Sequence, residues 1–248
     1  MIRTFLLAIV LPVYMTLVGG PLLLFALLTH RTTALYKAGL AGARLALWIS
    51  GIKVEAQGLE NVVRGSSAVY MANHQSNSDP AAVLSVLPPV LVLVKKEFFR
   101  VPLLGPAMKV RGFISIDRQH REQALVALNQ AVAKLRAGQS LLAYPEGTRS
   151  PDGRLQPFKK GVFRMAIQAG APIVPISVSG SSKLLQKGKR RIHPGTIRLT
   201  LHRPIATQGM TVEALDRLMA AVRQAIISGL AEDERPLDLP PAEDGELE

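Results

Sequence analysis

The chain has 248 residues, is 48% hydrophobic and carries a formal net charge of +12. It contains no cysteine, which excludes disulfides, thiolate nucleophiles and thiolate metal sites. Residues 1–229 hold 29 Lys and Arg against 10 Asp and Glu, so the excess positive charge predicts a polyanionic partner, either nucleic acid or an anionic lipid surface.

The N-terminal stretch from Thr4 to Thr29 has no charged residue. A helix needs about 20 apolar residues to cross a bilayer, so this stretch predicts membrane contact. Pro12 and the Gly19-Gly20-Pro21 cluster interrupt it, and two short pieces in one leaflet fit as well as one kinked span. A cleaved signal peptide is a weaker alternative, because the apolar run is long and no small-residue cleavage site follows.

A second stretch, Thr32 to Ser50, places Lys37 and Arg44 among leucines and Trp48. This pattern is typical of an interfacial amphipathic helix whose cations reach the water. Residues 1–50 are therefore predicted to form a membrane-associated helical hairpin.

From residue 51 to 229 the pattern is that of an α/β domain, with a mixed, largely parallel sheet flanked by helices. The predicted strands are Ile52–Ala56, Ala68–Ala72, Val90–Val94, Phe113–Ile116, Leu141–Tyr144, Ile173–Val178 and Thr196–His202. Helices are predicted over Pro80–Val86, His120–Leu135 and Thr211–Gly229. Residues 230–248 are acidic and proline-rich, which predicts a disordered tail.

The segment from Asn73 to Pro80 is a polar loop that follows one predicted strand and opens a helix. It holds His74 and Asp79. An imidazole held by a carboxylate through one nitrogen presents the other as a general base. The alternative is structural, because an Asp before a proline is an ordinary helix N-cap and His74 could be a turn histidine.

A second polar segment runs from Tyr144 to Ser150, where a hydrophobic strand breaks into a turn with the sequence Pro-Glu-Gly-Thr-Arg. Functional groups gather at strand ends in open α/β sheets. Gly147 permits a positive φ, and Arg149 could grip a phosphate with two donors. Taken alone, this segment also fits a surface turn with a solvated Glu-Arg pair.

Together the two segments resemble the glycerolipid acyltransferase family, and more closely its 1-acylglycerol-3-phosphate acyltransferase branch. Asn73–Asp79 is similar to the family's His-x4-Asp box, and Tyr144–Ser150 to its Phe-Pro-Glu-Gly-Thr-Arg-Ser box, with Tyr144 in place of phenylalanine. Gly112–Arg118 and Ala171–Ile176 look like the other two boxes. Four boxes in order are far more specific than any one, and under this reading residues 51–229 are the acyltransferase domain.

The resemblance implies a reaction of phospholipid synthesis. His74, oriented by Asp79, would remove the proton from the sn-2 hydroxyl of lysophosphatidic acid as that oxygen attacks an acyl thioester, giving phosphatidic acid. The donor would be acyl-CoA or an acyl carrier protein, with no covalent acyl-enzyme and no other cofactor. The five histidines are scattered and no His-Glu-x-x-His motif is present, so a metal site is not expected. The resemblance also implies a bacterial-type inner-membrane location with the catalytic face toward the cytoplasm.

The same resemblance assigns acceptor binding to six residues, namely Lys96, Arg118, Glu146, Gly147, Thr148 and Arg149. The arginines would bind the phosphate, Glu146 and Gly147 would shape its pocket, and Lys96 would add positive charge. Arg118 could instead pair with Asp117, and Lys96 could be a solvated charge at a strand end. Pro172 and Pro175 would form part of the pocket wall.

A basic run from Lys183 to His193 carries five cations. An anionic bilayer or an acidic carrier protein is the simpler partner for it, and nucleic acid is not expected; a solvated loop is the alternative. Rival functions are an acyltransferase for glycerol 3-phosphate, a lyso-ornithine lipid or another lysophospholipid, and a non-enzymatic basic protein of the membrane surface.

Overall fold

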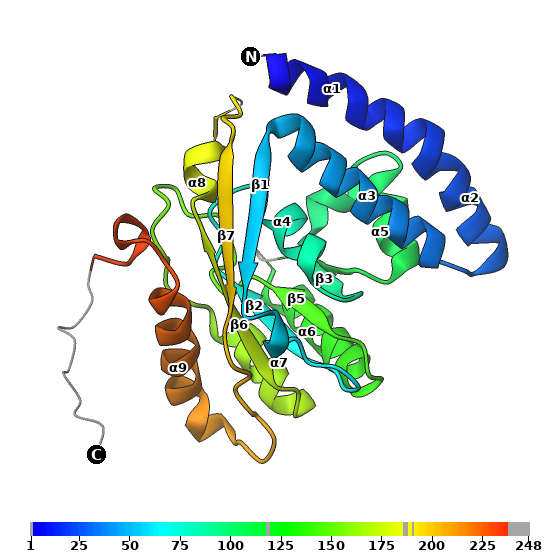
Figure 1. Ribbon diagram of the computed structural model, residues 1–248. Helices are drawn as coiled ribbons and strands as arrows, with labels where there is room; N and C mark the ends of the chain where they lie inside the picture. Colours follow the sequence, from blue (N-terminus) through cyan, green and yellow to red (C-terminus); the bar gives the residue numbers. More distant parts are fainter. Residues whose placement is uncertain (1, 118–119, 186–187, 190, 238–248) are drawn as a thin grey trace.

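The protein is described by a computed structural model over residues 2–117, 120–185, 188–189 and 191–237. Within these ranges a seven-stranded sheet forms the centre of the molecule, with helices on both faces (Figure 1). Its strands are β1 (Ile52–Gln57), β2 (Val69–Ala72), β3 (Leu91–Lys95), β4 (Ile114–Ile116), β5 (Leu141–Ala143), β6 (Ile173–Ser179) and β7 (Gly195–Leu201). All seven were predicted, with ends shifted by one residue at most.

The strands lie in the order β1-β7-β6-β2-β5-β3-β4. Strands β6, β2, β5, β3 and β4 are mutually parallel, whereas β7 runs antiparallel to β6, and β1 runs parallel to β7. The prediction of a mixed, largely parallel sheet is therefore confirmed. Because five strands point the same way, the loops that follow them meet at one edge.

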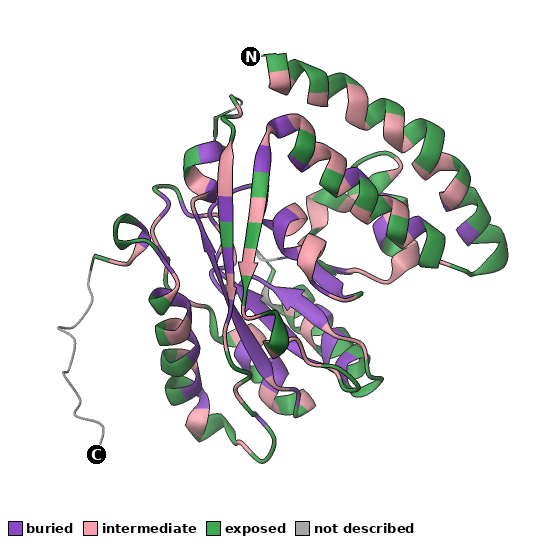
Figure 2. Ribbon diagram, viewed as in Figure 1, coloured by how far each residue is buried: buried purple, intermediate pink, exposed green. Residues whose placement is uncertain are grey.

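Helices cover the two faces of the sheet in separate layers. Those that follow the N-terminal rod are α3 (Thr33–Ser50), α4 (Asp79–Val86), α5 (Leu104–Arg111), α6 (Arg121–Arg136), α7 (Lys160–Ala169), α8 (Ser181–Leu184) and α9 (Leu215–Ser228). Alternate residues of β2 face opposite ways, so Val69 and Met71 pack with α6, α7 and α9, while Tyr70 and Ala72 pack with α3 and α4. The central strands are accordingly the most buried part of the molecule (Figure 2).

Three helices were not predicted, namely α5, α7 and α8. Helix α7 buries Phe163 and Ala166 against the sheet and ends at Gly170, whose φ of 65° is the left-handed cap that glycine favours. It spans only ten residues, so its apolar face gives a short periodic signal.

The N-terminal segment forms one uninterrupted helical rod from Ile2 to Thr29. It consists of α1 (Ile2–Tyr14), a π-helical turn (Met15–Gly19) and α2 (Gly20–Thr29). The prolines are therefore accommodated inside a helix, with the π turn lying between them. The rod is long and apolar enough to cross a membrane, with a mean hydropathy of 2.1.

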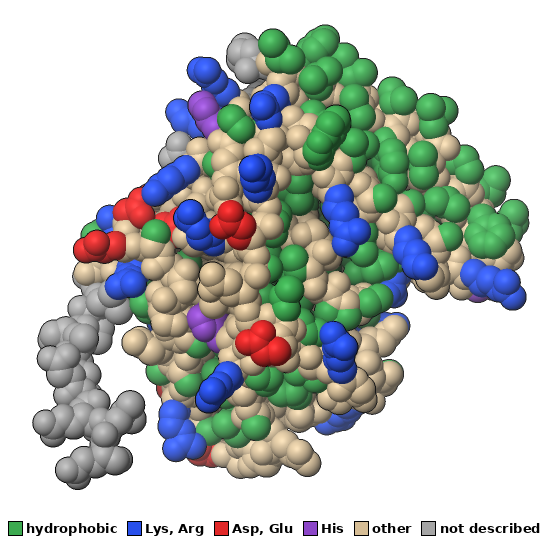
Figure 3. Space-filling model, in the orientation of Figure 1, with side chains coloured by type: hydrophobic (Ala, Val, Ile, Leu, Met, Phe, Trp, Pro, Cys, Tyr) green, Lys and Arg blue, Asp and Glu red, His purple; other side chains and the backbone are tan. Residues whose placement is uncertain are grey.

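The rod folds back along α3, so the predicted hairpin is present (Figure 1). Tyr14 donates a hydrogen bond from its hydroxyl to the carbonyl of Ala38 at 2.9 Å. Apolar side chains remain exposed along the rod, including Phe5, Leu17 and Leu28. Figure 3 shows this apolar surface over the N-terminal helices, bordered by cations.

The predicted start of a disordered tail at residue 230 is wrong for residues 230–237. Leu230 packs in the core at 3% exposure, and Glu234 is 2% exposed inside a short 3-10 turn, Glu232–Glu234. The acidic composition predicted solvated carboxylates throughout this segment, but the carboxylate of Glu234 is hydrogen-bonded to the domain. The rest of the predicted tail, 238–248, lies outside the described residues.

Candidate active site

The two polar segments found in the sequence meet at the carboxyl edge of the sheet. Strands β2 and β5 are parallel neighbours, so the loop after Ala72 and the turn after Ala143 emerge side by side. Two backbone-level bonds join them: the His74 N–H donates to Glu146 Oε1 at 2.5 Å, and the Ser150 N–H donates to the His74 carbonyl at 2.7 Å. The predicted site residues of the two boxes thus form one cluster.

His74 and Asp79 are paired. His74 Nδ1 lies 2.8 Å from Asp79 Oδ2, and Asp79 is fully buried, whereas the side chain of His74 is 15% exposed. The contact fixes Nδ1 as the protonated nitrogen, because a carboxylate accepts and does not donate. Nε2, on the opposite side of the ring, is left to accept a proton, as a general base requires.

Asp79 does not act as the N-cap of α4. Its Oδ2 accepts the N–H groups of Gln75 and Ser76, each at 2.7 Å, in addition to His74. These donors precede Asp79 in the chain, so the carboxylate turns back into the loop instead of capping the helix ahead of it. Among the two readings of this segment, the geometry favours the oriented histidine.

Tyr144 stacks on the His74 ring, with ring centroids 4.1 Å apart and an angle of 25° between the planes. Burial, and then the charge of Asp79, raise the pKa of the Tyr144 hydroxyl well above its usual range. The ring is thus a neutral wall that limits the orientation of the imidazole. An aromatic residue was recognised at this position from sequence, but its contact with His74 was not.

Glu146 is 3% exposed, and its carboxylate links the loop that carries His74 to the chain that follows Ser150. Its second oxygen, Oε2, accepts the Gln156 N–H at 2.9 Å. Burial raises the pKa of Glu146 to about 8, although the two backbone donors and Arg223 lower it in part. Both oxygens accept backbone N–H groups, so Glu146 holds this part of the chain together, and its role in shaping the acceptor pocket stays a prediction.

Gly147, Thr148 and Arg149 continue the turn beyond Glu146. Gly147 has the predicted positive φ, of 73°. A Cβ there would lie 3.1 Å from the Lys159 side chain, so glycine also makes room for that lysine. Thr148 is exposed and Arg149 half-buried, one residue from the Ser150 contact to His74. Their roles in binding stay predictions.

Lys96 lies just after β3, and its ammonium group pairs with the buried carboxylate of Asp117, which follows β4. His120 Nδ1 contacts the same Asp117 oxygen at 2.9 Å. Lys96 is therefore not the solvated strand-end charge of the alternative reading, and its contribution to acceptor binding stays a prediction. Arg118 lies outside the described residues, as do Lys187 and Arg190 of the basic run.

Two prolines were predicted to form part of the pocket wall, and for Pro172 this prediction is wrong. Its carbonyl accepts the Val69 N–H at the start of β2, so it lies at the edge opposite to His74. Pro175 lies within β6, in register with Met71.

The residues that hold the His74 loop in place were not predicted from the sequence. Asn73 is fully buried, and its amide exchanges two hydrogen bonds with the backbone of Val178, at 2.7 and 2.8 Å. Gln75 is also buried and donates to the Gly153 carbonyl at 2.9 Å. Both partners are distant in the chain, so local pattern gave no signal for them.

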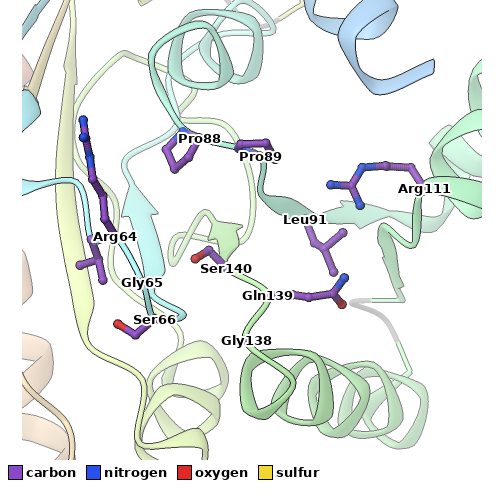
Figure 4. Close-up of a pocket in the computed structure, with 11 residues that line it drawn as sticks. Arg64, Gly65, Ser66, Pro88, Pro89, Leu91, Arg111, Gly138, Gln139 and Ser140 are labelled. Carbon is purple, nitrogen blue, oxygen red and sulfur yellow. The ribbon is translucent and has the colours of Figure 1, made fainter. Parts of the chain in front are cut away.

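A separate cavity of about 410 Å³ lies at the amino ends of β2, β3 and β5 (Figure 4). Ser66, Pro89 and Ser140 are among the residues that line it. Since β2 and β5 run from this edge toward His74, the cavity is at the wrong end of the sheet to belong to the site.

Residues 53–179 match the family model described as "Acyltransferase". The chain is 35% identical to a 1-acyl-sn-glycerol-3-phosphate acyltransferase of Limnanthes alba over 78% of this chain and 69% of that protein. It is 32% identical to the alpha form of the enzyme from Mus musculus over 74% of this chain and 65% of that protein.

A solved structure has the same fold. The crystal structure of the 1-acyl-sn-glycerophosphate acyltransferase PlsC from Thermotoga maritima superposes with a TM-score of 0.81 at 26% identity, covering 92% of both chains. The likeness includes the N-terminal region as well as the sheet, because so little of either chain is left out.

Proposed function

The chain belongs to the acyltransferase family, and we propose that it is a membrane-bound 1-acyl-sn-glycerol-3-phosphate acyltransferase that makes phosphatidic acid. The observation that carries the proposal is the His74–Asp79 pair at 2.8 Å, at the edge of the sheet where the turn bearing Arg149 also emerges. The first part of the arrangement supplies a base, and the second supplies a cation for a phosphate.

In the proposed reaction, His74 Nε2 takes the proton from the sn-2 hydroxyl as its oxygen attacks the thioester carbonyl carbon. The resulting tetrahedral intermediate collapses by breaking the carbon–sulfur bond, and the imidazolium returns the proton to the departing thiolate. Asp79 stabilises the imidazolium between the two steps. The donor is acyl-CoA or an acyl carrier protein, and the reaction needs no other cofactor.

Arg149 and Arg118 bind the acceptor phosphate in this proposal. A guanidinium matches two phosphate oxygens at once, which favours a phosphorylated acceptor over a lyso-ornithine lipid. Gly147 and Thr148 form the turn that presents Arg149, and Lys96 adds positive charge next to Asp117.

The apolar side chains of α1 and α2 are exposed along the rod, which supports contact between a membrane and the outer side of the helical hairpin. Arg31 follows α2, Lys37 and Arg44 lie on α3, and all three are exposed, so they would meet anionic head groups. Acyl thioesters are cytosolic, so we place the catalytic face on the cytoplasmic side of a bacterial-type inner membrane.

The test is an assay of the full chain in detergent with lysophosphatidic acid and either acyl-CoA or acyl carrier protein. His74→Ala should lower kcat by about a hundredfold to ten-thousandfold. The exposed His193 provides a matched control, since His193→Ala should keep full turnover. Near-normal kcat in the His74 variant would exclude it as the base.

Acceptor recognition is tested with Arg149→Ala and, as its control, Arg217→Ala on the surface of α9. The first change should raise KM for lysophosphatidic acid by about 10- to 100-fold, because a charge-assisted pair contributes about 1.5–3 kcal/mol. An effect on donor KM alone would contradict the assignment. Replacing the acceptor with glycerol 3-phosphate or a lyso-ornithine lipid in the same assay distinguishes the rival activities.

A further inference from the structure

Glu234 is a buried acidic residue for which the proposed reaction has no direct use. It lies beyond the matched family region, in the short turn Glu232–Glu234 after α9, and is 2% exposed. One carboxyl oxygen accepts the Gly180 N–H at 2.7 Å, and the other accepts the Ser179 hydroxyl at 2.5 Å. The side chain therefore holds the end of β6 and the start of α8.

The backbone around Glu234 holds a second segment. Its carbonyl accepts the Leu155 N–H at 2.9 Å, and the Arg235 carbonyl accepts Arg154 Nη1 at 2.9 Å. Residues 154 and 155 follow the turn that carries Arg149. The segment 231–235 thus joins two pieces of chain that come from different strands of the sheet.

Both pieces hold Gln75, the residue next to His74. The Ser181 hydroxyl donates to Gln75 Oε1 at 3.2 Å, and Gln75 Nε2 donates to the Gly153 carbonyl at 2.9 Å. Ser181 adjoins Gly180, and Gly153 is two residues from Leu155. Gln75 in turn donates its backbone N–H to Asp79 Oδ2 at 2.7 Å.

We propose that Glu234 is a positioning residue for acyl transfer, which fixes Gln75 from both sides and thereby holds Asp79 and His74 in register. This inference rests on the proposed role of His74 as base. A misplacement of about 1 Å at a reacting group can cost about a hundredfold in rate, so loss of this support should affect turnover.

The test compares Glu234→Gln and Glu234→Ala with wild type. We expect kcat to fall about tenfold in the glutamine variant, whose amide turns an N–H group toward existing donors, and by more in the alanine variant. KM for lysophosphatidic acid should change by less than about threefold, since Glu234 does not face the acceptor. A wild-type kcat in Glu234→Gln overturns the inference, whether or not the alanine variant folds.

Two controls separate positioning from stability. Asp233→Ala breaks an exposed ion pair with Lys183 in the same turn, and Leu218→Ala truncates a core residue of α9. The first should leave kcat unchanged. The second should lower the unfolding temperature at unchanged kcat, and a comparable loss of kcat in this variant would mean that destabilisation alone explains the Glu234 effect.

A double-mutant cycle tests the route through Gln75. If Glu234 acts by holding Gln75, the combined loss of kcat in Gln75→Ala with Glu234→Gln should be clearly smaller than the product of the separate losses. If the loss of kcat in the double variant equals the product of the two separate losses, Glu234 does not act through Gln75. Near-normal activity of His74→Ala would instead show that His74 is not the base, and this result is independent of the kcat measured for the Glu234 variants.

Discussion

At the scale of single residues, the site depends on one carboxylate oxygen that accepts several hydrogen bonds. Asp79 Oδ2 alone receives His74 Nδ1 and the N–H groups of Gln75 and Ser76. One carboxylate therefore folds the loop and selects the tautomer of the histidine. A change at Asp79 consequently affects both the orientation and the charge balance of the base.

Asp79→Asn should lower kcat by about a hundredfold to ten-thousandfold while the fold is retained. The neutral amide can still accept one set of donors, but it cannot stabilise the imidazolium that forms during proton transfer. Ser78→Ala serves as the control in the same loop, because the Ser78 side chain bonds to Ser76 and not to Asp79. Steady-state kinetics in detergent provide the measurement, and an unchanged kcat in Asp79→Asn would contradict the role of the pair.

Glu146 should make stability depend on pH. Burial raises its pKa from 4.5 to about 8, so the folded state binds a proton that the unfolded state releases between these values. The stabilising contribution is complete below about pH 4.5 and is lost as the pH rises through 8. Urea unfolding of wild type and Glu146→Gln should show the stability of wild type falling relative to the variant from pH 5 to 8.5. A constant difference would show that the pKa is not raised.

At the scale of elements, the hairpin depends on close contact between α1 and α3. A Cβ on Gly42 would lie 2.9 Å from the Tyr14 ring, whereas one on Gly39 would meet nothing within 4 Å. Both glycines lie in the interior of α3, so they differ in packing and not in helix position. The pair offers a direct measure of how tightly the apolar N-terminal rod is held against α3.

Gly39→Ala should stabilise the protein by up to about 1 kcal/mol, because alanine is the better helix former. Gly42→Ala should lack that gain or be destabilising, because the added methyl displaces Tyr14 and its hydrogen bond to Ala38. Thermal unfolding of both variants in detergent measures the difference. Equal stabilisation by the two changes would mean that α1 does not pack on α3 as described.

At the scale of the whole molecule, the exposed apolar surface of the N-terminal helices and a group of positive charges lie on the same side of the protein. Exposed apolar side chains of α1 and α2 are bordered by cations (Figure 3). Among the exposed cations, Arg31 follows α2, and Lys37 and Arg44 lie on α3. Membrane binding should therefore have an apolar part that is insensitive to salt and an electrostatic part that is screened over about 10 Å at 0.1 M salt.

Replacing Arg31, Lys37 and Arg44 with alanine should weaken binding to vesicles that contain phosphatidylglycerol by on the order of 100-fold, at about 1 kcal/mol per cation. Binding to phosphatidylcholine vesicles should hardly change. The control replaces three exposed cations elsewhere, Lys134, Arg164 and Arg217. Co-sedimentation measures both, and an equal loss in the control would mean that net charge, and not this surface, determines binding.

The sequence by itself determined the seven strands and the hairpin and singled out His74, Asp79 and Arg149 as candidates, because periodicity and short boxes are local properties. Only the tertiary structure decided how these residues are held. Asn73 bonds to Val178, and Glu234 bonds to Gly180, across 105 and 54 positions of chain. Such partners leave no local pattern, since a buried carboxyl group and a solvated one look the same in an acidic segment. For the same reason Asp79 could be read as a helix cap until the fold turned its oxygen back toward His74.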